Sequence, residues 1–170
     1  MKFLPAKKED LPLIMQLIGE AQAYLDAQHI EQWQNGYPNE TAILKDMLNN
    51  ESYIVKSEDS SLLATAMFTT TNEPTYKSIK GNWITESDAI YGVIHRMAVG
   101  EKFRGTGIAK FIFNHCEQIL KQNSIQSMRI DTHEDNLGMQ ALLKKLSYVF
   151  CGVIYLENSD KRLAFEKLIH

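Results

Sequence analysis

Apolar and polar positions along the first half of the chain follow helical spacing first and strand-like spacing later. From Leu11 to Leu25, apolar side chains recur every three or four residues, which is typical of one face of an amphipathic helix. Farther along, two short apolar runs flank a charged, serine-rich turn at 56–61, which favours a β-hairpin. The elements predicted for this half are a strand at 2–5, helices at about 9–27 and 40–48, and strands at 53–55 and 62–68.

The second half begins with a polar connection and continues with alternating strands and helices. Residues 69–88 are polar and include Pro74 and Gly81, so we expect a long surface connection there. An apolar stripe that begins at Ile108 predicts a helix directly after Gly107. The other predicted elements are strands at 89–99, 128–132, 148–156 and 163–169 and a helix at 137–146.

This order of elements indicates an α+β fold. The succession β-α-α-β-β-β-α-β-α-β-β suggests α/β/α layers, with a mixed, mainly antiparallel sheet and helices on both of its faces. A chain of 170 residues buries roughly 70% of its unfolded surface on folding, so one core is the economical organisation. We therefore predict a single domain over 1–170.

Composition and charge exclude a few partners. Apolar residues make up 44% and charged residues 23%, and the formal net charge is −3, which gives no general attraction to nucleic acid or anionic membranes. The charged run from Lys7 to Asp10 comes before any apolar secretory core could form, and no later stretch approaches the ~20 apolar residues of a membrane span, so we expect a cytoplasmic protein. Cys116 and Cys151 are too few for a disulfide framework or a metal quartet, and we expect no metal.

The segment Arg104-Gly105-Thr106-Gly107 gives the strongest chemical signal. It stands just before the predicted helix, where unpaired amides and about half a positive charge from the helix dipole favour an anion. Glycine lets the backbone approach a phosphate, because a Cβ would obstruct the approach and penalise positive φ. Arg104 would add charge-assisted hydrogen bonds. On the two glycines alone, a tight turn without a ligand is an equal alternative.

Two other phosphate-binding patterns fit this segment poorly. A Walker-type loop would end in Gly-Lys-Ser/Thr, and a dinucleotide fingerprint would need a third glycine at fixed spacing; both are absent. A nucleotide-binding oxidoreductase is therefore the weakest of the functions considered.

The residues around this segment resemble motif A of the GNAT N-acetyltransferase superfamily, whose pattern is Q/R-x-x-G-x-G/A. The resemblance rests on Ile94 to Val99, Lys102, Phe103 to Ala109, Arg129 to Thr132, Asn136, and Ser147-Tyr148, where many members carry Gly-Phe. It covers the predicted order of elements along nearly all of the chain. The resemblance implies acetyl transfer from acetyl-CoA to a primary amine of a small molecule or peptide, and it leaves a homodimer open.

The resemblance also implies which residues hold acetyl-CoA. In that family the strand before the glycine loop separates from the next strand, and the pantetheine arm pairs with its backbone. The residues carried over are Met97, Ala98 and Val99 at the pantetheine, Arg104, Gly105, Thr106, Gly107, Ile108 and Ala109 at the pyrophosphate, and Asn136 beside the cofactor.

Proton transfer needs a base, because an alkyl amine with a pKa near about 10.4 attacks only when neutral. Asp131 is the first candidate, since some family members place an acidic base near this strand end, and His133 would share its face of the strand. Glu134 and His95 are reserves. A turn carboxylate paired with Arg129 and an ordinary surface histidine are the structural alternatives for Asp131 and His133.

The expected general acid is missing. Many family members place a tyrosine where this chain has Leu143. A thiol with a pKa near about 8.5 is a tolerable leaving group, so water can serve as the proton donor. The departure leaves open a second function, a non-catalytic acyl-CoA-binding or sensor module.

The irregular segment 32–38 is the predicted acceptor wall, because in the family the region between the first two helices lines the acceptor side. Trp33 and Tyr37 offer flat apolar faces with a polar tip, suited to an alkyl amine or to packing under the helices. Glu31 and Glu40 would attract a cation.

Overall fold

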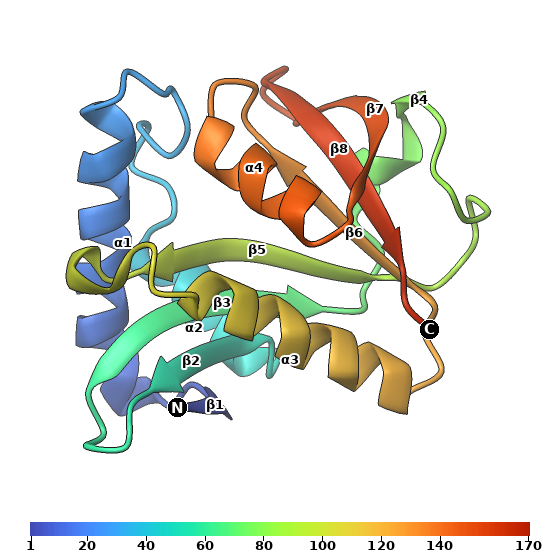
Figure 1. The fold of residues 1–170 in the computed structure, drawn as a ribbon. Coiled ribbons are helices and arrows are strands. Elements are labelled where there is room, and N and C mark those ends of the chain that lie inside the picture. Colours follow the sequence, from blue (N-terminus) through green and yellow to red (C-terminus); the bar gives the residue numbers. More distant parts are fainter. The chain divides into compact units, whose positions relative to one another are not determined.

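A computed structural model describes all 170 residues of the chain. Its structure divides into two compact units: unit 1 comprises 1–68 and 94–115, and unit 2 comprises 69–93 and 116–170. The strands are β1 (Lys2–Pro5), β2 (Ser52–Lys56), β3 (Leu62–Thr69), β4 (Lys80–Gly81), β5 (Gly92–Val99), β6 (Ser127–Thr132), β7 (Val149–Tyr155) and β8 (Lys161–Leu168) (Figure 1). The helices are α1 (Leu11–Asp26), α2 (Glu40–Leu48), α3 (Ile108–Gln122) and α4 (Leu137–Lys145), with 3-10 helices η1 (Lys8–Asp10), η2 (Pro74–Lys77) and η3 (Glu101–Phe103).

The strands form a mixed sheet in the order β1-β2-β3-β5-β6-β8-β7-β4. The pairs β1–β2, β2–β3, β6–β8, β7–β8 and β4–β7 are antiparallel, whereas β5 and β6 are parallel. The predicted mixed, mainly antiparallel sheet and the predicted β2–β3 hairpin are therefore confirmed.

Helices cover both faces of the strands in unit 1. Phe3 of β1 pairs with Val55 of β2, so strand alternation places Phe3 and Tyr53 on one face and Ile54 on the other. The Phe3 and Tyr53 rings stack with centroids 4.9 Å apart, and the ring of His115 on α3 lies 5.6 Å from Phe3. Ile54 joins the helices of the opposite face, as predicted for a layered fold.

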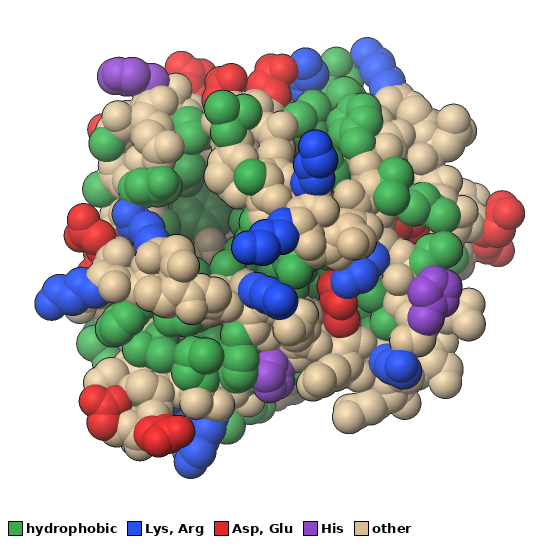
Figure 2. Space-filling model, viewed as in Figure 1, with side chains coloured by type: hydrophobic (Ala, Val, Ile, Leu, Met, Phe, Trp, Pro, Cys, Tyr) green, Lys and Arg blue, Asp and Glu red, His purple; other side chains and the backbone are tan.

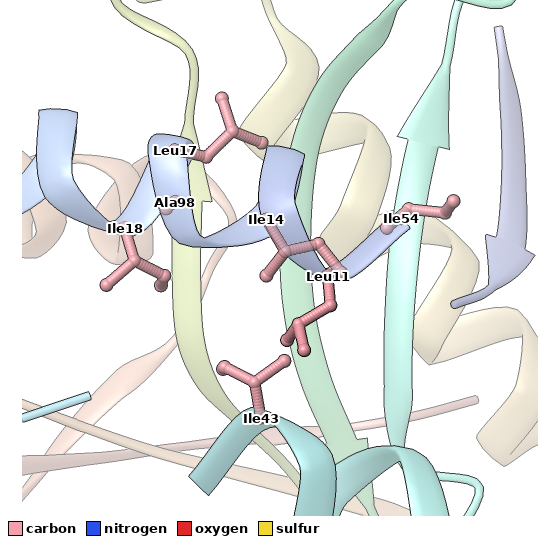
Figure 3. Close-up of a cluster of buried hydrophobic side chains, with 7 residues drawn as sticks. All are labelled: Leu11, Ile14, Leu17, Ile18, Ile43, Ile54 and Ala98. Carbon is pink, nitrogen blue, oxygen red and sulfur yellow. The ribbon is translucent and has the colours of Figure 1, made fainter. Parts of the chain in front are cut away.

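A cluster of buried apolar side chains holds α1 and α2 against that second face. Its members recur at helical spacing on α1 and meet single residues from α2, β2 and β5: Leu11, Ile14, Leu17, Ile18, Ile43, Ile54 and Ala98 (Figure 3). Full burial of an aliphatic side chain of this size contributes about 1.5–3 kcal/mol. We call this set the α1 cluster, and the helical stripe seen in the sequence is the reason it forms.

Unit 2 has a core of its own, which includes part of the segment that we expected to be a surface connection. Tyr76 of η2 and Tyr91 are buried with Val93, and the Trp83 indole donates a hydrogen bond to the Tyr76 carbonyl at 2.9 Å. The segment also contains the short strand β4, which pairs with β7. The expectation of a surface loop was wrong for these residues, because aromatic side chains within a polar sequence anchor it.

Two further features of the helices and side chains concern membranes and metals. Every helix is too short or too polar to cross a membrane. No group of three or more His, Cys, Asp or Glu side chains is arranged to hold a metal ion. On the face shown in Figure 2, basic and acidic side chains both occur among hydrophobic ones.

Candidate functional site

Strand β5 contains one left-handed residue, Arg96, and we infer a bend of the strand there. Its first two residues, Gly92 and Val93, pair in parallel with β6, and three residues later Arg96 takes a left-handed backbone conformation with φ of 50°. An isolated left-handed residue within a strand redirects the strand that follows, as in a β-bulge. The segment 97–99 therefore lies beyond both the β6 pairing and the bend.

The three residues after the bend differ in the exposure of their side chains. The Ala98 side chain is buried in the α1 cluster, whereas Met97 and Val99 are half-buried. At the end of the strand, the Gly100 amide donates a hydrogen bond to the Leu63 carbonyl of β3 at 2.9 Å. Ala98 thus offers a ligand its backbone only, which fits the backbone role that the family resemblance implies.

The glycine turn, Arg104–Gly107, connects η3 to α3. Gly105 and Gly107 have φ of 76° and 91°, and a Cβ built on either glycine would have no atom within 4 Å. Left-handed backbone costs other residues roughly 1–2 kcal/mol, so both positions favour glycine although neither is crowded by the protein. Both glycines are exposed at the start of α3, where the first amides have no carbonyl one turn earlier. The turn is therefore an open loop whose two glycines have left-handed backbone conformations.

Arg104 is held by α1. Its guanidinium donates to the Glu20 carbonyl at 2.9 Å and lies 4.0 Å from the centre of the Tyr24 ring. The Glu20 carboxylate in turn accepts from the Glu101 amide at 3.0 Å, and this bond is the main cause that lowers the Glu20 pKa. The sequence analysis did not foresee this anchoring. Glu20 and Tyr24, one turn apart on α1, were its only signal.

Helix α4 directly follows the predicted site residue Asn136 and contains Leu143, where many family members have a tyrosine. Asn136 is the N-cap, and its side-chain oxygen accepts from the Met139 amide at 3.0 Å. Leu143 is fully buried, so at this position the chain has an apolar core residue. Ser147, where many family members carry glycine, has φ of 67°. That left-handed conformation explains the preference for glycine there.

Asp131 has a defined partner in unit 2. The hydroxyl of buried Tyr76 donates to its Oδ1 at 2.7 Å. Burial, with the Asp131 charge as a further cause, raises the pKa of Tyr76 well above its usual value, so Tyr76 is a donor at neutral pH. Arg129, proposed above as a structural partner for Asp131, instead lies 3.1 Å from Glu166.

His133 and the reserve base Glu134 are also engaged. The Asp135 amide donates to His133 Nδ1 at 3.2 Å, so a neutral ring carries its proton on Nε2. The Nε2–H group of such a ring can donate a hydrogen bond. The Glu134 carboxylate pairs with Lys161 at 2.7 Å, which lowers the pKa of Glu134 and favours a structural role for it.

The predicted acceptor residues lie in unit 1. Trp33 is half-buried and packs against the α1 cluster, while Tyr37 is 43% exposed. The Tyr37 hydroxyl accepts a hydrogen bond from Arg96, whose guanidinium also binds the Asp46 carboxylate. Arg96 and Asp46 were missed by the sequence analysis. Their signal is a pair of charged residues at positions where apolar ones are expected, in a strand and on the buried face of α2.

Comparisons with known proteins agree with the fold. A profile of the Acetyltransferase (GNAT) family matches residues 20–148. The crystal structure of a GNAT-family acetyltransferase from Streptococcus agalactiae is 31% identical, with 99% of this chain and 95% of that chain covered and a TM-score of 0.89. No curated protein matches significantly.

More distant structures share the fold. A GNAT-family acetyltransferase from Listeria monocytogenes is 17% identical, covers 98% of this chain and 94% of its own, and has a TM-score of 0.77. The ribosomal-protein-S18-alanine N-acetyltransferase from Escherichia coli is 13% identical, with 99% and 93% covered and a TM-score of 0.62. With its profile match and its relative from Streptococcus agalactiae, the chain belongs to the GNAT family of acetyltransferases.

Proposed function

We propose that the chain transfers an acetyl group from acetyl-CoA to a primary amine of a small molecule or peptide, by direct attack of the amine on the thioester. The glycine turn carries this proposal. Its two glycines are left-handed, exposed and free of neighbouring atoms at the start of α3, which is the arrangement that a phosphate requires. Family membership supplies acyl transfer as the reaction class.

The residues present fit acetyl-CoA. An added Cβ on Gly105 or Gly107 would enter open space, so the turn leaves room for a pyrophosphate against the backbone from Gly105 to Ala109. The backbone of Met97, Ala98 and Val99 follows the bend in β5 and would hold the pantetheine arm. When bound, acetyl-CoA supplies an activated carbonyl, and the protein supplies orientation and proton transfer.

Asp131 is proposed as the base. In the reaction an N–C bond forms, the C–S bond breaks, and the amine loses a proton, which the Asp131 carboxylate accepts. The hydrogen bond from Tyr76 at 2.7 Å fixes one oxygen of that carboxylate. His133, which accepts a hydrogen bond at Nδ1, presents its Nε2–H as a hydrogen-bond donor rather than as a second base. The departing sulfur takes its proton from water, because Leu143 offers none.

The acceptor class is proposed from Trp33 and Tyr37. The Tyr37 ring is exposed and the Trp33 ring is half-buried, and both present apolar faces suited to an alkyl amine. A neighbour with the same fold is named for the alanine of a ribosomal protein, so peptides with a free N-terminal alanine belong among the acceptors to be tested.

A thiol-release assay tests the proposal. The protein is mixed with acetyl-CoA and a panel of polyamines, amino acids, aminoglycosides and peptides, and free CoA thiol is followed with time. We expect release that depends on one class of amine, with the acetylated amine detected by mass spectrometry. Absence of acetyl-CoA binding by calorimetry would contradict the proposal at its first step.

A further inference from the structure

The bend in β5 requires a backbone conformation that its residue does not favour. Arg96 has φ of 50°, and L residues other than glycine, asparagine and aspartate rarely take this left-handed conformation. Such a conformation persists only where the surrounding structure enforces it, and it is commonly found near functional sites. The contacts of the Arg96 side chain show what enforces it here.

Three hydrogen bonds hold the Arg96 guanidinium. Nε donates to Asp46 Oδ2 at 2.7 Å and Nη2 donates to Asp46 Oδ1 at 2.6 Å, a two-pronged arrangement that fixes the plane of the group. Nη1 donates to the Tyr37 hydroxyl. The Arg96 and Asp46 side chains are 13% and 5% exposed, so water competes little with these bonds.

The location of Asp46 argues against a role in stability alone. It lies on α2 one turn after Ile43, on the face that packs into the α1 cluster. Burial raises the pKa of the Asp46 carboxyl, and the bonds from Arg96 offset this only in part. Replacing a buried ion pair by apolar residues is often neutral or stabilising. What an apolar residue could not supply is the fixed orientation of Arg96.

We propose that Asp46, Arg96 and Tyr37 are positioning residues that form a clamp on the bend of β5. By holding Arg96 in its left-handed conformation, the clamp fixes the backbone of Met97, Ala98 and Val99 in the direction that the acyl-bearing arm requires. Tyr37 connects this strand to the acceptor segment 32–38. The inference rests on the proposed function, because it assigns the pantetheine arm, and not the phosphates, to the backbone of Met97, Ala98 and Val99.

Two ligands distinguish an effect on the clamp from an effect on the glycine turn. Acetyl-CoA has both phosphates and arm, whereas 3′-phosphoadenosine 5′-diphosphate keeps the phosphates and lacks the arm. For Asp46→Asn we expect kcat/KM to fall about tenfold or more, because small misplacement of a bound reactant is costly. Affinity for acetyl-CoA should fall while affinity for the arm-less fragment stays within about twofold.

Asp10→Asn is the matched control in the same unit. The Asp10 carboxylate is also buried and accepts from Lys56 at 2.9 Å and from the Lys7 amide at 2.9 Å, but it lies at the start of α1. Asp10→Asn should lower the free energy of unfolding without changing the ratio of the affinities for acetyl-CoA and the arm-less fragment. Asp46→Glu, which keeps the carboxylate, should recover part of the acetyl-CoA affinity.

The outcomes are distinct. If wild-type protein binds neither ligand, the proposed function is wrong. If wild type binds both ligands and Asp46→Asn leaves the ratio of their dissociation constants unchanged, the clamp proposal is overturned. Should Asp46→Asn fail to fold, Tyr37→Phe removes one bond at the exposed end and leaves the buried pair intact. A smaller shift of the ratio in the same direction, about twofold to threefold, supports the clamp, and an unchanged ratio refutes it.

Discussion

Each unit of the molecule contains one buried arginine–carboxylate pair, and the two pairs have different surroundings. In unit 2 the guanidinium of Arg129 lies between the rings of Trp83 and Tyr91, 4.5 and 4.1 Å from their centres, and binds Glu166 at 3.1 Å. In unit 1 the guanidinium of Arg96 binds Asp46 and reaches the exposed Tyr37. The first pair is enclosed, while the second extends from the core to the surface.

The carboxylates of the two pairs also differ in pKa. Burial opposes the charge on Glu166, but hydrogen bonds from Ser127, Thr85, Arg129 and the Ile84 amide together lower its pKa. Asp46 is buried with fewer donors, and burial raises its pKa. The same pair of chemical groups therefore has the pKa of its carboxylate shifted in opposite directions in the two units. This contrast indicates that a buried ion pair must be judged by its remaining partners.

The largest expected effect is on stability in unit 2. Glu166→Gln leaves the Arg129 charge buried without a counter-charge, so the free energy of unfolding should fall by about 3–5 kcal/mol. Urea denaturation measures this. Acetyl-CoA affinity of the folded variant should stay near that of wild type. The proposed difference between the two pairs is contradicted if Asp46→Asn lowers the free energy of unfolding by more than Glu166→Gln does.

Asp131, the proposed base, should behave differently from Glu166 within the same unit. Asp131→Asn should lower kcat by about a hundredfold or more while acetyl-CoA affinity is kept, since a base acts on the amine proton. The loss should be greatest at low pH, where the neutral amine is rarest. Steady-state kinetics from pH 6 to 9 measure it, with Asp160→Asn in the β7–β8 turn as control. Wild-type turnover across that range would make Asp131 structural.

Lowering the pH should change the contributions of Glu166 and Asp46 to stability in opposite directions. Because the Glu166 pKa is lowered on folding, its contribution is present above the unfolded value of about 4.3 and is lost as pH falls through the folded value. Wild type and Glu166→Gln should therefore converge in stability as pH falls from the unfolded value through the lower folded value. The raised Asp46 pKa gives a contribution that is present below about 3.9 and lost as pH rises. The contrast is contradicted if Glu166→Gln and Asp46→Asn change the free energy of unfolding with the same dependence on pH.

The smallest expected effect concerns the acceptor. Trp33→Ala should raise the KM for the amine about threefold to tenfold and leave that for acetyl-CoA nearly unchanged. Because the Trp33 ring packs against the α1 cluster, some stability should be lost as well. If stability falls and amine kinetics do not change, Trp33 belongs to the core alone.

Local patterns were sufficient to predict most of the helices and strands and the turn geometry at the two glycines. Periodic apolar positions define α1, and the limits of α2 at Glu40 and Leu48 agree with the predicted ones. The glycines were identified because a left-handed turn ahead of a helix favours that residue type, and their φ values of 76° and 91° fit the reason given.

Long-range polar contacts were not predictable in the same way. The bend at Arg96 has no local signature, because its residue is not glycine and its partner Asp46 is 50 positions away in the sequence. Tyr76 occurs in a polar stretch, and its burial depends on contacts with residues such as Asp131, 55 positions later. In both cases tertiary contacts, which no short window of sequence contains, decide the conformation.

The central claim is that the glycine turn binds the phosphates of acetyl-CoA, and one matched pair of variants tests it directly. Gly105 and Gly36 have φ of 76° and 70°, and a Cβ on either would have no atom within 4 Å. Alanine should therefore cost both positions similar stability, roughly 1–2 kcal/mol. In calorimetric titration with acetyl-CoA, Gly105→Ala should weaken binding about tenfold, or 1.4 kcal/mol, and Gly36→Ala should bind like wild type. Equal dissociation constants for the two folded variants would show that the phosphates bind elsewhere.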